Sequence, residues 1–290
     1  YVVREISDKG FEQKKKRNFS DAITLFERVL GLNGSDIHTM MSIANCYHEL
    51  GQYSSGIEYL NKIIQISPDY HAAYNNLSIC YSELGDYERA KEYAERALEL
   101  NPTYPDYLYT LGSVFRNLGN YGEALKFLMK ADQSDPNKKD IMYELANCYT
   151  ATDATDKAVK ILERMTLLFP KEPLSFIDLG IIYLNNKLYK NGMDYFKSAL
   201  ELEPDDPVIY YNIAVAYRET NQDNLAVDIY MKALLRNPEL VVDFWEYGNL
   251  LLDLDISTEF KYEILSFGAE YGDVKAKEEL EGNLWLGEEE

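Results

Sequence analysis

The chain contains 290 residues and carries a formal net charge of −20, from 29 basic and 49 acidic side chains. This acidic balance argues against a nucleic acid or an anionic membrane as the main partner, because both need a basic surface. Apolar residues make up 46% of the chain, which is enough for a folded core. No apolar run approaches the about 18 residues that would predict a transmembrane helix.

The first segment, residues 3–36, has a weak helical pattern. Ala22, Phe26 and Val29 are spaced as one apolar stripe of a helix, whereas Lys9 stands at a position that is apolar later in the chain. A basic run, Lys14-Lys15-Lys16-Arg17, lies between the two expected helices of this segment. It is interpreted as a solvated helix end, with a localisation signal or a patch for an acidic partner as alternatives.

From residue 37 onward the sequence repeats itself every 34 residues. Six prolines have this spacing without a slip, at Pro68, Pro102, Pro136, Pro170, Pro204 and Pro238. An aromatic residue recurs in the same register, at Tyr47, Tyr81, Phe115, Tyr149, Tyr183 and Tyr217. Small residues recur as well, at Ala44, Ser78, Gly112, Ala146, Gly180, Ala214 and Gly248. Such self-similarity predicts a stack of identical structural units.

Each unit is expected to contain two helices. Residues 74–81 form one apolar stripe with helical spacing, and residues 90–98 form a second. Gly85 between them suits the left-handed end of a helix, and Asn101-Pro102 ends the second helix because proline disfavours helix in the preceding residue. The small residues are expected where the two helices cross, since a larger side chain would push their axes apart.

This pattern resembles the tetratricopeptide repeat (TPR) family, whose 34-residue scheme is W-x2-L-G-x2-Y…A-x3-F…A…P. Residues 74–81, Tyr-Asn-Asn-Leu-Ser-Ile-Cys-Tyr, and residues 106–115 carry the resemblance well. The resemblance implies an all-α fold, a right-handed superhelical α-α solenoid of about eight helix pairs with a C-terminal capping helix.

The resemblance also sets the expected domain organisation. The TPR array is expected over residues 1–274. Clear repeats cover residues 37–240, between an atypical first repeat at 3–36 and a degenerate eighth at 241–274. Residues 275–290 are expected to form the capping helix and an acidic tail. Terminal repeats are usually atypical because they face solvent rather than a neighbour.

In this family the first helix of each pair lines a concave face, which implies a peptide groove. The residues expected there occupy the second, fifth, sixth, ninth, twelfth and thirteenth positions of each repeat. The candidates are Asn45, Asn76, Tyr109, Arg116, Tyr143, Asn147, Tyr211, Asn212, Arg218, Trp245 and Asn249. Asparagine can pair with a peptide backbone, and tyrosine and arginine are common binding anchors. The alternative is that these residues form only the polar side of amphipathic helices.

The charge on this face indicates what kind of partner fits. Asn45 and Asn76 match two places of the clamp by which one TPR subclass holds the acidic tails of chaperones. The basic places of that clamp hold Met41, Asp106 and Thr110 instead, so chaperone tails are not expected as ligands. All face positions together carry ten acids and five bases, which favours a neutral or basic partner segment.

No motif in the chain indicates catalysis. The cysteines, Cys46, Cys80 and Cys148, share one repeat position and are expected to be buried free thiols, too far apart for disulfides. This usage favours the cytoplasm, with a secreted or periplasmic chain, or a removed targeting segment before the non-Met start, as alternatives. No metal, nucleotide or nucleophile motif occurs, so we expect no enzyme activity, no metal and no cofactor.

The sequence therefore predicts a scaffold or adaptor that binds an extended or helical segment of another protein. One alternative is the substrate-recognition or regulatory arm of a larger enzyme, suggested by a start without Met and an abrupt Glu288-Glu289-Glu290 end. The other alternative is self-association through the solenoid ends, where apolar surface is exposed.

Overall fold

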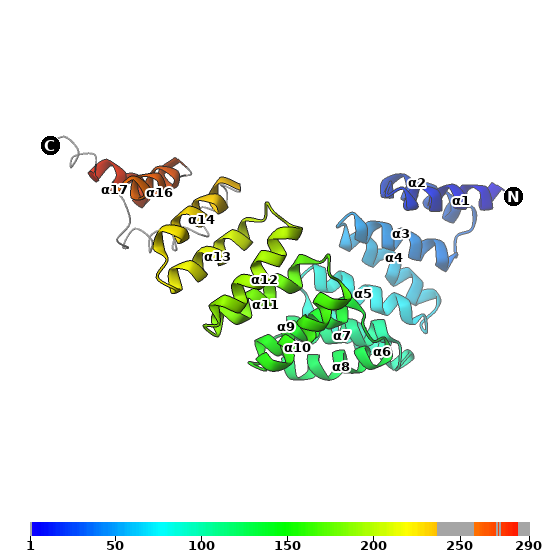
Figure 1. Ribbon diagram of the computed structural model, residues 1–290. Helices are drawn as coiled ribbons and strands as arrows, with labels where there is room; N and C mark the ends of the chain where they lie inside the picture. The colour runs from blue at the N-terminus through cyan, green and yellow to red at the C-terminus, as the bar shows by residue number, and fades with distance from the viewer. Residues whose placement is uncertain (1, 237–257, 271, 273, 284–290) are drawn as a thin grey trace. The chain divides into compact units, whose positions relative to one another are not determined.

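The repeated helical stripes of the sequence are realised as antiparallel helix pairs (Figure 1). The computed structural model describes residues 2–236, 258–270, 272 and 274–283, and all regular structure in these ranges is α-helical. The all-α solenoid expected from the sequence is thus confirmed. The chain divides into two compact units, Tyr1–Ala158 and Val159–Glu290.

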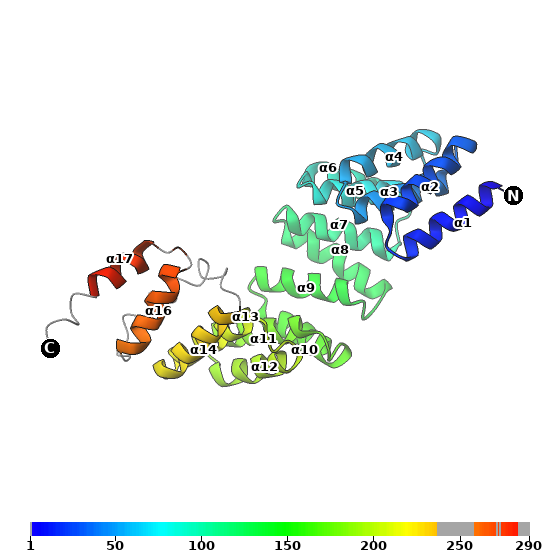
Figure 2. The same cartoon turned by 90° about the horizontal axis from the view of Figure 1, so that it is seen from above.

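Unit 1 contains consecutive helix pairs, which Figure 2 shows following one another from α1 to α8. The first helices of its pairs are α1 (Val2–Lys15), α3 (Ile37–Glu49), α5 (His71–Glu83), α7 (Pro105–Asn117) and α9 (Lys139–Ala151). The second helices are α2 (Phe19–Leu32), α4 (Tyr53–Ile66), α6 (Tyr87–Leu100) and α8 (Tyr121–Ser134). The boundary between the units falls inside α10 (Thr155–Leu168).

The first helices α5, α7 and α9 of unit 1 form a continuous layer. Each second helix packs against its own first helix and against the first helix of the next pair. In addition, α5 contacts α7 directly and α7 contacts α9. Side chains that project from α5, α7 and α9 on the side away from the second helices therefore share one surface.

The turn inside each pair contains a residue in the left-handed backbone region. These residues recur every 34 positions and have φ angles between 54° and 77°: Arg17, Gly51, Gly85, Gly119, Asp153, Lys187 and Asn221. At Gly51, the amide N–H donates to the carbonyl of His48 at 2.9 Å, and the following amide donates to the carbonyl of Tyr47 at 2.9 Å. The turn thus satisfies carbonyls at the end of the first helix, and it needs positive φ to do so.

Lys187→Gly is expected to raise the free energy of unfolding by about 0.5–1 kcal/mol. Lys187 is exposed and has a φ of 62°. This conformation costs a residue with a Cβ about 1–2 kcal/mol, and glycine avoids that cost. Part of the gain is offset because glycine makes the unfolded chain more flexible. Equilibrium urea unfolding followed by circular dichroism measures the change. As a control, Lys197→Gly inside α12 (Tyr189–Leu202) should instead lower stability by about 1 kcal/mol; a loss of stability at Lys187 as well would contradict the turn geometry.

The two helices of a pair cross where a small residue faces a large one located 16 residues later. A Cβ added at Gly180 would lie 2.4 Å from the Phe196 ring, and one added at Gly10 would lie 2.6 Å from the Phe26 ring. At Gly112 the same Cβ would lie 2.7 Å from Leu128. These distances are below any real van der Waals contact, so the small residues are required for close helix packing.

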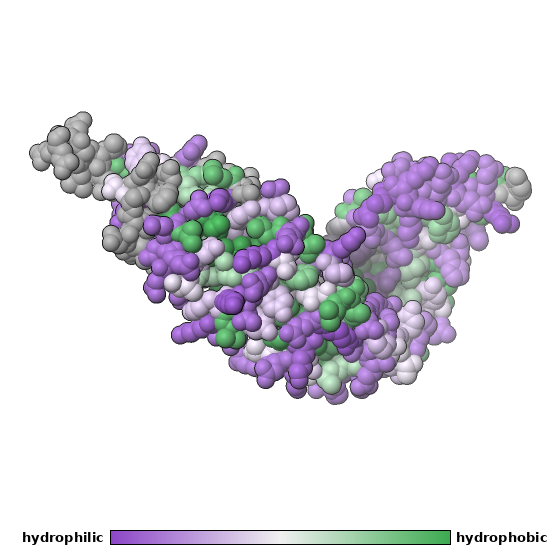
Figure 3. All heavy atoms as spheres, in the orientation of Figure 1, coloured by the Kyte–Doolittle hydropathy of each residue, from purple (hydrophilic) through white to green (hydrophobic). Residues whose placement is uncertain are grey.

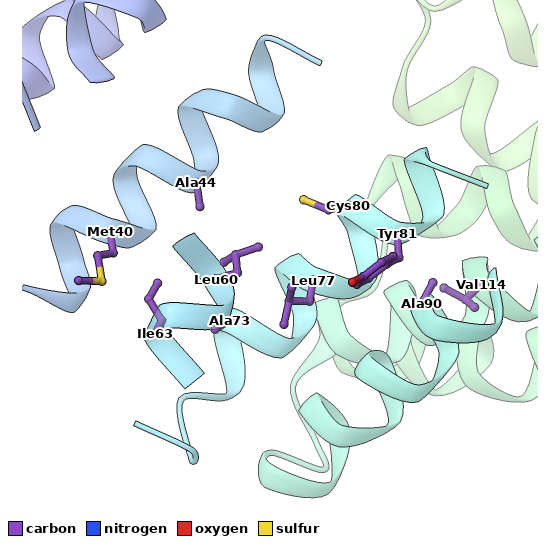
Figure 4. Packing of buried hydrophobic residues seen from close by; sticks show 10 residues of the cluster. All are labelled: Met40, Ala44, Leu60, Ile63, Ala73, Leu77, Cys80, Tyr81, Ala90 and Val114. Carbon is purple, nitrogen blue, oxygen red and sulfur yellow. The ribbon is translucent and has the colours of Figure 1, made fainter. Parts of the chain in front are cut away.

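The core of unit 1 runs through successive pairs. Figure 4 shows Met40 and Ala44 of α3 facing Leu60 of α4, with Leu77 and Cys80 of α5 next in the same cluster. Leu60 and Leu77 are fully buried. Because apolar contacts continue from one pair to the next, each repeat is stabilised by its neighbours.

Unit 2 contains α11 (Pro173–Asn185), α12, α13 (Pro207–Glu219), α14 (Asp223–Arg236), α16 (Thr258–Glu270) and α17 (Val274–Asn283). One apolar cluster joins Tyr230 of α14 to Ile264 and Leu265 of α16 and Ala276 of α17. The array boundary expected at residue 274 stays a prediction, because residues 237–257 lie outside the described residues.

Two further observations concern the described residues as a whole. Cys46, Cys80 and Cys148 are buried and free, which confirms the expectation of free buried thiols. None of the described helices is both long and apolar enough to cross a lipid bilayer. In Figure 3, hydrophilic residues cover most of the visible surface over α1 and α2.

Candidate functional site

The candidate residues of unit 1 lie on consecutive first helices. The structure places Asn45 on α3 and Asn76 on α5, Tyr109 and Arg116 on α7, and Tyr143 and Asn147 on α9, all of them half-buried. In unit 2, Tyr211, Asn212 and Arg218 lie half-buried on α13. Trp245 and Asn249 lie outside the described residues. The described candidates of unit 1 therefore lie on consecutive first helices, and those of unit 2 lie on α13.

Two of the candidate asparagines contact each other. The Nδ2 of Asn76 donates to the Oδ1 of Asn45 at 2.9 Å, and it also lies 3.2 Å from the Sδ of Met41. This pairing links α3 to α5 and fixes both amide planes. The Nδ2 of Asn45 and the Oδ1 of Asn76 keep hydrogen-bonding capacity, which suits the C=O and N–H of a peptide backbone.

Arg116 is held by a carboxylate from the next repeat. Its Nε lies 2.5 Å from the Oε2 of Glu144, and its Nη2 donates to Oε1 at 3.1 Å. The Glu144 side chain is only 12% exposed, whereas the Arg116 side chain is 34% exposed. The Nη2 contact is a charge-assisted hydrogen bond and the Nε contact is an ion-pair contact without hydrogen-bond geometry. Arg116 thus ties α7 to α9, and its charge is largely neutralised on the face.

The surface around Tyr109 is slightly acidic. Burial, with the nearby Glu144 carboxylate as a second cause, raises the pKa of Tyr109 above its ordinary value. Lys138 is paired with Asp106, and the hydrogen bond to that carboxylate raises the pKa of Lys138. Asp140 is exposed and has no cation within 4.0 Å in the described part of the chain. One carboxylate is therefore left over after the ion pairs are formed.

A cavity of about 520 Å³ opens between α1, α3, α4 and α5 in unit 1. It is lined by Lys14, Lys15, Arg17, Phe19, Ala44, Asn45, His48, Glu49, Leu60, Asn76, Ile79 and Cys80. Its volume is within the range typical of ligand pockets, about 300–1,000 Å³. It includes the paired asparagines Asn45 and Asn76 but also cations from the end of α1.

The cations of this cavity belong to the basic run for which the sequence left a patch for an acidic partner as an alternative, and they were not among the groove candidates. Lys14 and Lys15 occupy the twelfth and thirteenth positions of the first repeat, one period before His48 and Glu49. The same register that gave the other candidates therefore marks them as face residues. His48, at the twelfth position of the second repeat, also lines the cavity.

A second cavity, of about 710 Å³, lies among α6, α7 and α8. Its lining is mixed: Leu98, Leu108, Leu111 and Phe127 are apolar, Glu95, Glu99 and Lys130 are charged, and it contains none of the candidate residues. No cluster of three or more metal-ligating side chains occurs among the residues that the structure describes.

Comparison with family models identifies the repeats. Five models described as tetratricopeptide repeat match the chain, over residues 35–103, 81–139, 115–175, 175–206 and 195–228. Together they cover residues 35–228 without a gap. The chain belongs to the tetratricopeptide repeat family, whose members are typically scaffolds for protein–protein interaction rather than enzymes.

Solved structures with the same fold are numerous. A tetratricopeptide repeat protein from Parabacteroides merdae has a TM-score of 0.65 at 14% identity, covering 84% of this chain and 97% of its own. The C-terminal part of a TPR protein from Cytophaga hutchinsonii has a TM-score of 0.66 at 19% identity, covering 81% and 97%. YrrB, described as a TPR protein with an unusual peptide-binding site, has a TM-score of 0.54 at 21% identity, covering 66% and 98%. A search of curated proteins finds no matching relative.

Proposed function

We propose that the protein is an interaction adaptor that binds an extended or helical segment of a partner protein on the first helices of unit 1. The observation that carries this proposal is the recurrence of half-buried amide and tyrosine side chains on α3, α5, α7 and α9. Tyr109 and Tyr143 stand one repeat apart at the same position, and Asn45 is hydrogen-bonded to Asn76. A merely solvated helix face has no need of tyrosines at these places.

The chemistry of the face matches a peptide ligand. Paired amides offer a donor and an acceptor to a peptide backbone, and tyrosines provide large contact area with few rotatable bonds. The exposed carboxylate of Asp140, which acts on Tyr109, favours a neutral or basic segment at α7 and α9. The peptide-binding site in the description of YrrB, a protein of the same fold, agrees with this kind of ligand.

Replacing Tyr109, Tyr143 and Asn147 together with alanine is expected to abolish capture of the partner. The substitutions remove two aromatic anchors and one amide, each of which typically costs more than about 1 kcal/mol at a binding hot spot, so the bound amount should fall more than about tenfold. Affinity capture from native extract, read by quantitative mass spectrometry, compares the variant with the wild type.

A matched control removes tyrosines elsewhere. Tyr87 and Tyr121 are also half-buried, but they begin the second helices α6 and α8. The Tyr87→Ala/Tyr121→Ala variant should retain the partner, and circular dichroism should show all three proteins folded. If the set of captured proteins is the same for the triple variant as for the wild type, the face is not the binding site. Sedimentation of the same samples tests self-association through the solenoid ends.

A further inference from the structure

The cavity between α1 and α5 differs in charge from the rest of the face. Lys14, Lys15 and Arg17 line it, and Glu49 is the one carboxylate among its lining residues. Neither Lys14 nor Lys15 has a carboxylate within 4.0 Å in the described part of the chain. A cluster of cations in a chain with a net charge of −20 is a local reversal of the overall field.

The pairing inside the cluster leaves most of its charge available. The Nη2 of Arg17 lies 3.4 Å from the Oε2 of Glu49, and their side chains are 77% and 42% exposed. Exposed pairs of this kind are weak because water and salt screen them. An incoming carboxylate can therefore compete with Glu49 for Arg17 and meet Lys14 and Lys15 without displacing a partner.

Below the cations the cavity is apolar. Ala44 and Cys80 are 2% exposed and Leu60 is fully buried, while Ile79 is half-buried at the wall. Burial raises the pKa of the Cys80 thiol to about 11, so the sulfur is neutral at physiological pH and behaves as an apolar group. The cavity thus combines an apolar floor with a cationic rim.

We propose that this cavity binds an acidic segment of a protein partner. One aliphatic or aromatic side chain of the segment packs on Ile79, the accessible residue of the apolar floor, and the flanking aspartate or glutamate carboxylates pair with Lys14 and Lys15. The inference rests on the proposed function in so far as the occupant is a protein segment. It assigns acidic side chains to the part of the segment bound at α1, whereas the face at α7 and α9 favours neutral or basic ones.

A peptide fits the cavity better than other anions. The acidic surface of the chain as a whole repels a nucleic acid, whose binding depends on many phosphate contacts. A free phosphate would leave the apolar floor unfilled. Asn45 and Asn76 at the rim are suited to a peptide backbone, as described above. The occupant is therefore an extended peptide whose two ends differ in charge. The end at α1 is acidic, and the end at α9 is neutral or basic.

The test uses the full chain with four acidic fluorescein-labelled octapeptides and a neutral counterpart of each. Each acidic peptide has Leu, Ile, Phe or Tyr at its centre, flanked by aspartate and glutamate. In its neutral counterpart, asparagine replaces each aspartate and glutamine replaces each glutamate. Fluorescence anisotropy should show at least one acidic peptide binding about tenfold tighter than its counterpart. Raising the salt from about 0.05 M to about 0.5 M should remove most of this difference, because the Debye length falls from roughly 14 Å to 4 Å.

Two variants within the same basic run locate the binding. Lys14→Gln combined with Lys15→Gln should weaken the acidic peptide at least about fivefold. Lys16→Gln is the control, because Lys16 belongs to the same basic run but pairs with Glu12 at 2.6 Å and does not line the cavity. It should leave the affinity unchanged, and circular dichroism should show both variants folded.

The proposal is overturned if no acidic peptide binds tighter than its neutral counterpart, or if Lys16→Gln weakens binding as much as the double variant does. The outcome is separable from that of the proposed function. The Tyr109/Tyr143/Asn147 variant should still bind the acidic octapeptide, because those residues lie outside the cavity. Loss of partner capture with retained peptide binding supports both ideas; retained capture with intact peptide binding moves the partner site to the α1 end.

Discussion

Gly180→Val is expected to lower the free energy of unfolding by about 3 kcal/mol or more. Even an alanine Cβ at this position would lie 2.4 Å from the Phe196 Cε1 and 2.6 Å from its Cδ1. Phe196 is fully buried, in one cluster with Ile177 and Ile213, so the ring has no space into which to withdraw. The added volume must therefore separate α11 from α12. Overpacking of a core typically costs about 1–3 kcal/mol and sometimes more.

Two comparisons make this prediction specific. Gly31→Val places the same side chain in α2 where no atom lies within 4 Å of the new Cβ, and stability should change by less than about 0.5 kcal/mol. Gly180→Ala combined with Phe196→Leu should recover much of the loss caused by Gly180→Ala alone. Urea unfolding at equilibrium compares the four variants with the wild type. A cost below about 0.5 kcal/mol for Gly180→Val would contradict the helix crossing between α11 and α12.

Arg116→Met is expected to be the second most damaging of the changes considered, at about 2 kcal/mol. The substitution keeps most of the apolar stem but removes the cation from Glu144, whose side chain is 12% exposed. A poorly hydrated carboxylate without its partner is costly, up to about 3–5 kcal/mol when fully buried, and the 34% exposure of Arg116 reduces this figure.

The ion-pair origin of the effect is tested by a double-mutant cycle. Glu144→Gln in the Arg116→Met background should restore at least about 1 kcal/mol, because the orphaned charge is removed. Lys126→Met serves as the control, since Lys126 and Glu123 form a 3.1 Å pair with side chains 56% and 42% exposed. Its effect should stay within about 0.5 kcal/mol. Equal losses at Lys126 and Arg116 would show that Glu144 is better solvated than the structure indicates.

The helical architecture was predictable because every repeat carries the same residues that start and end its helices. Proline marks the end of each second helix, as at Pro102 after α6, and a left-handed residue marks the turn, as at Gly85. Repetition in register turns weak local signals into a strong one. Where the turn carries Lys187 or Asp153 instead of glycine, the register alone indicates the same backbone conformation.

Pairings between side chains of neighbouring repeats were not predictable. Arg116 was expected as a binding anchor, yet its guanidinium contacts Glu144 of the next repeat. Similarly, Asn45 and Asn76 contact each other. Which acid, base or amide meets which depends on the rotation between successive pairs and on rotamers. A sequence with 49 acidic residues leaves these choices open.

Two features of the first repeat follow the register of the later repeats. Gly10 stands one period before Ala44 and meets Phe26 as closely as its counterparts meet their partners. Lys14 and Lys15 stand one period before His48 and Glu49 and line the same cavity. Although Lys9 stands at a position that is apolar in later repeats, the first repeat keeps the 34-residue register in the structure.

The matching of small and large residues at the helix crossings has an evolutionary consequence. Gly180 faces Phe196, and Gly112 faces Leu128, always 16 positions apart inside one 34-residue repeat. Both members of such a couple are encoded on the same short stretch of the gene. A duplication or deletion of one whole period carries the complementary shapes together, so the array can lengthen or shorten by unequal recombination without a mismatched crossing. A point mutation at either member has no such protection, and its compensation must arise within the same repeat.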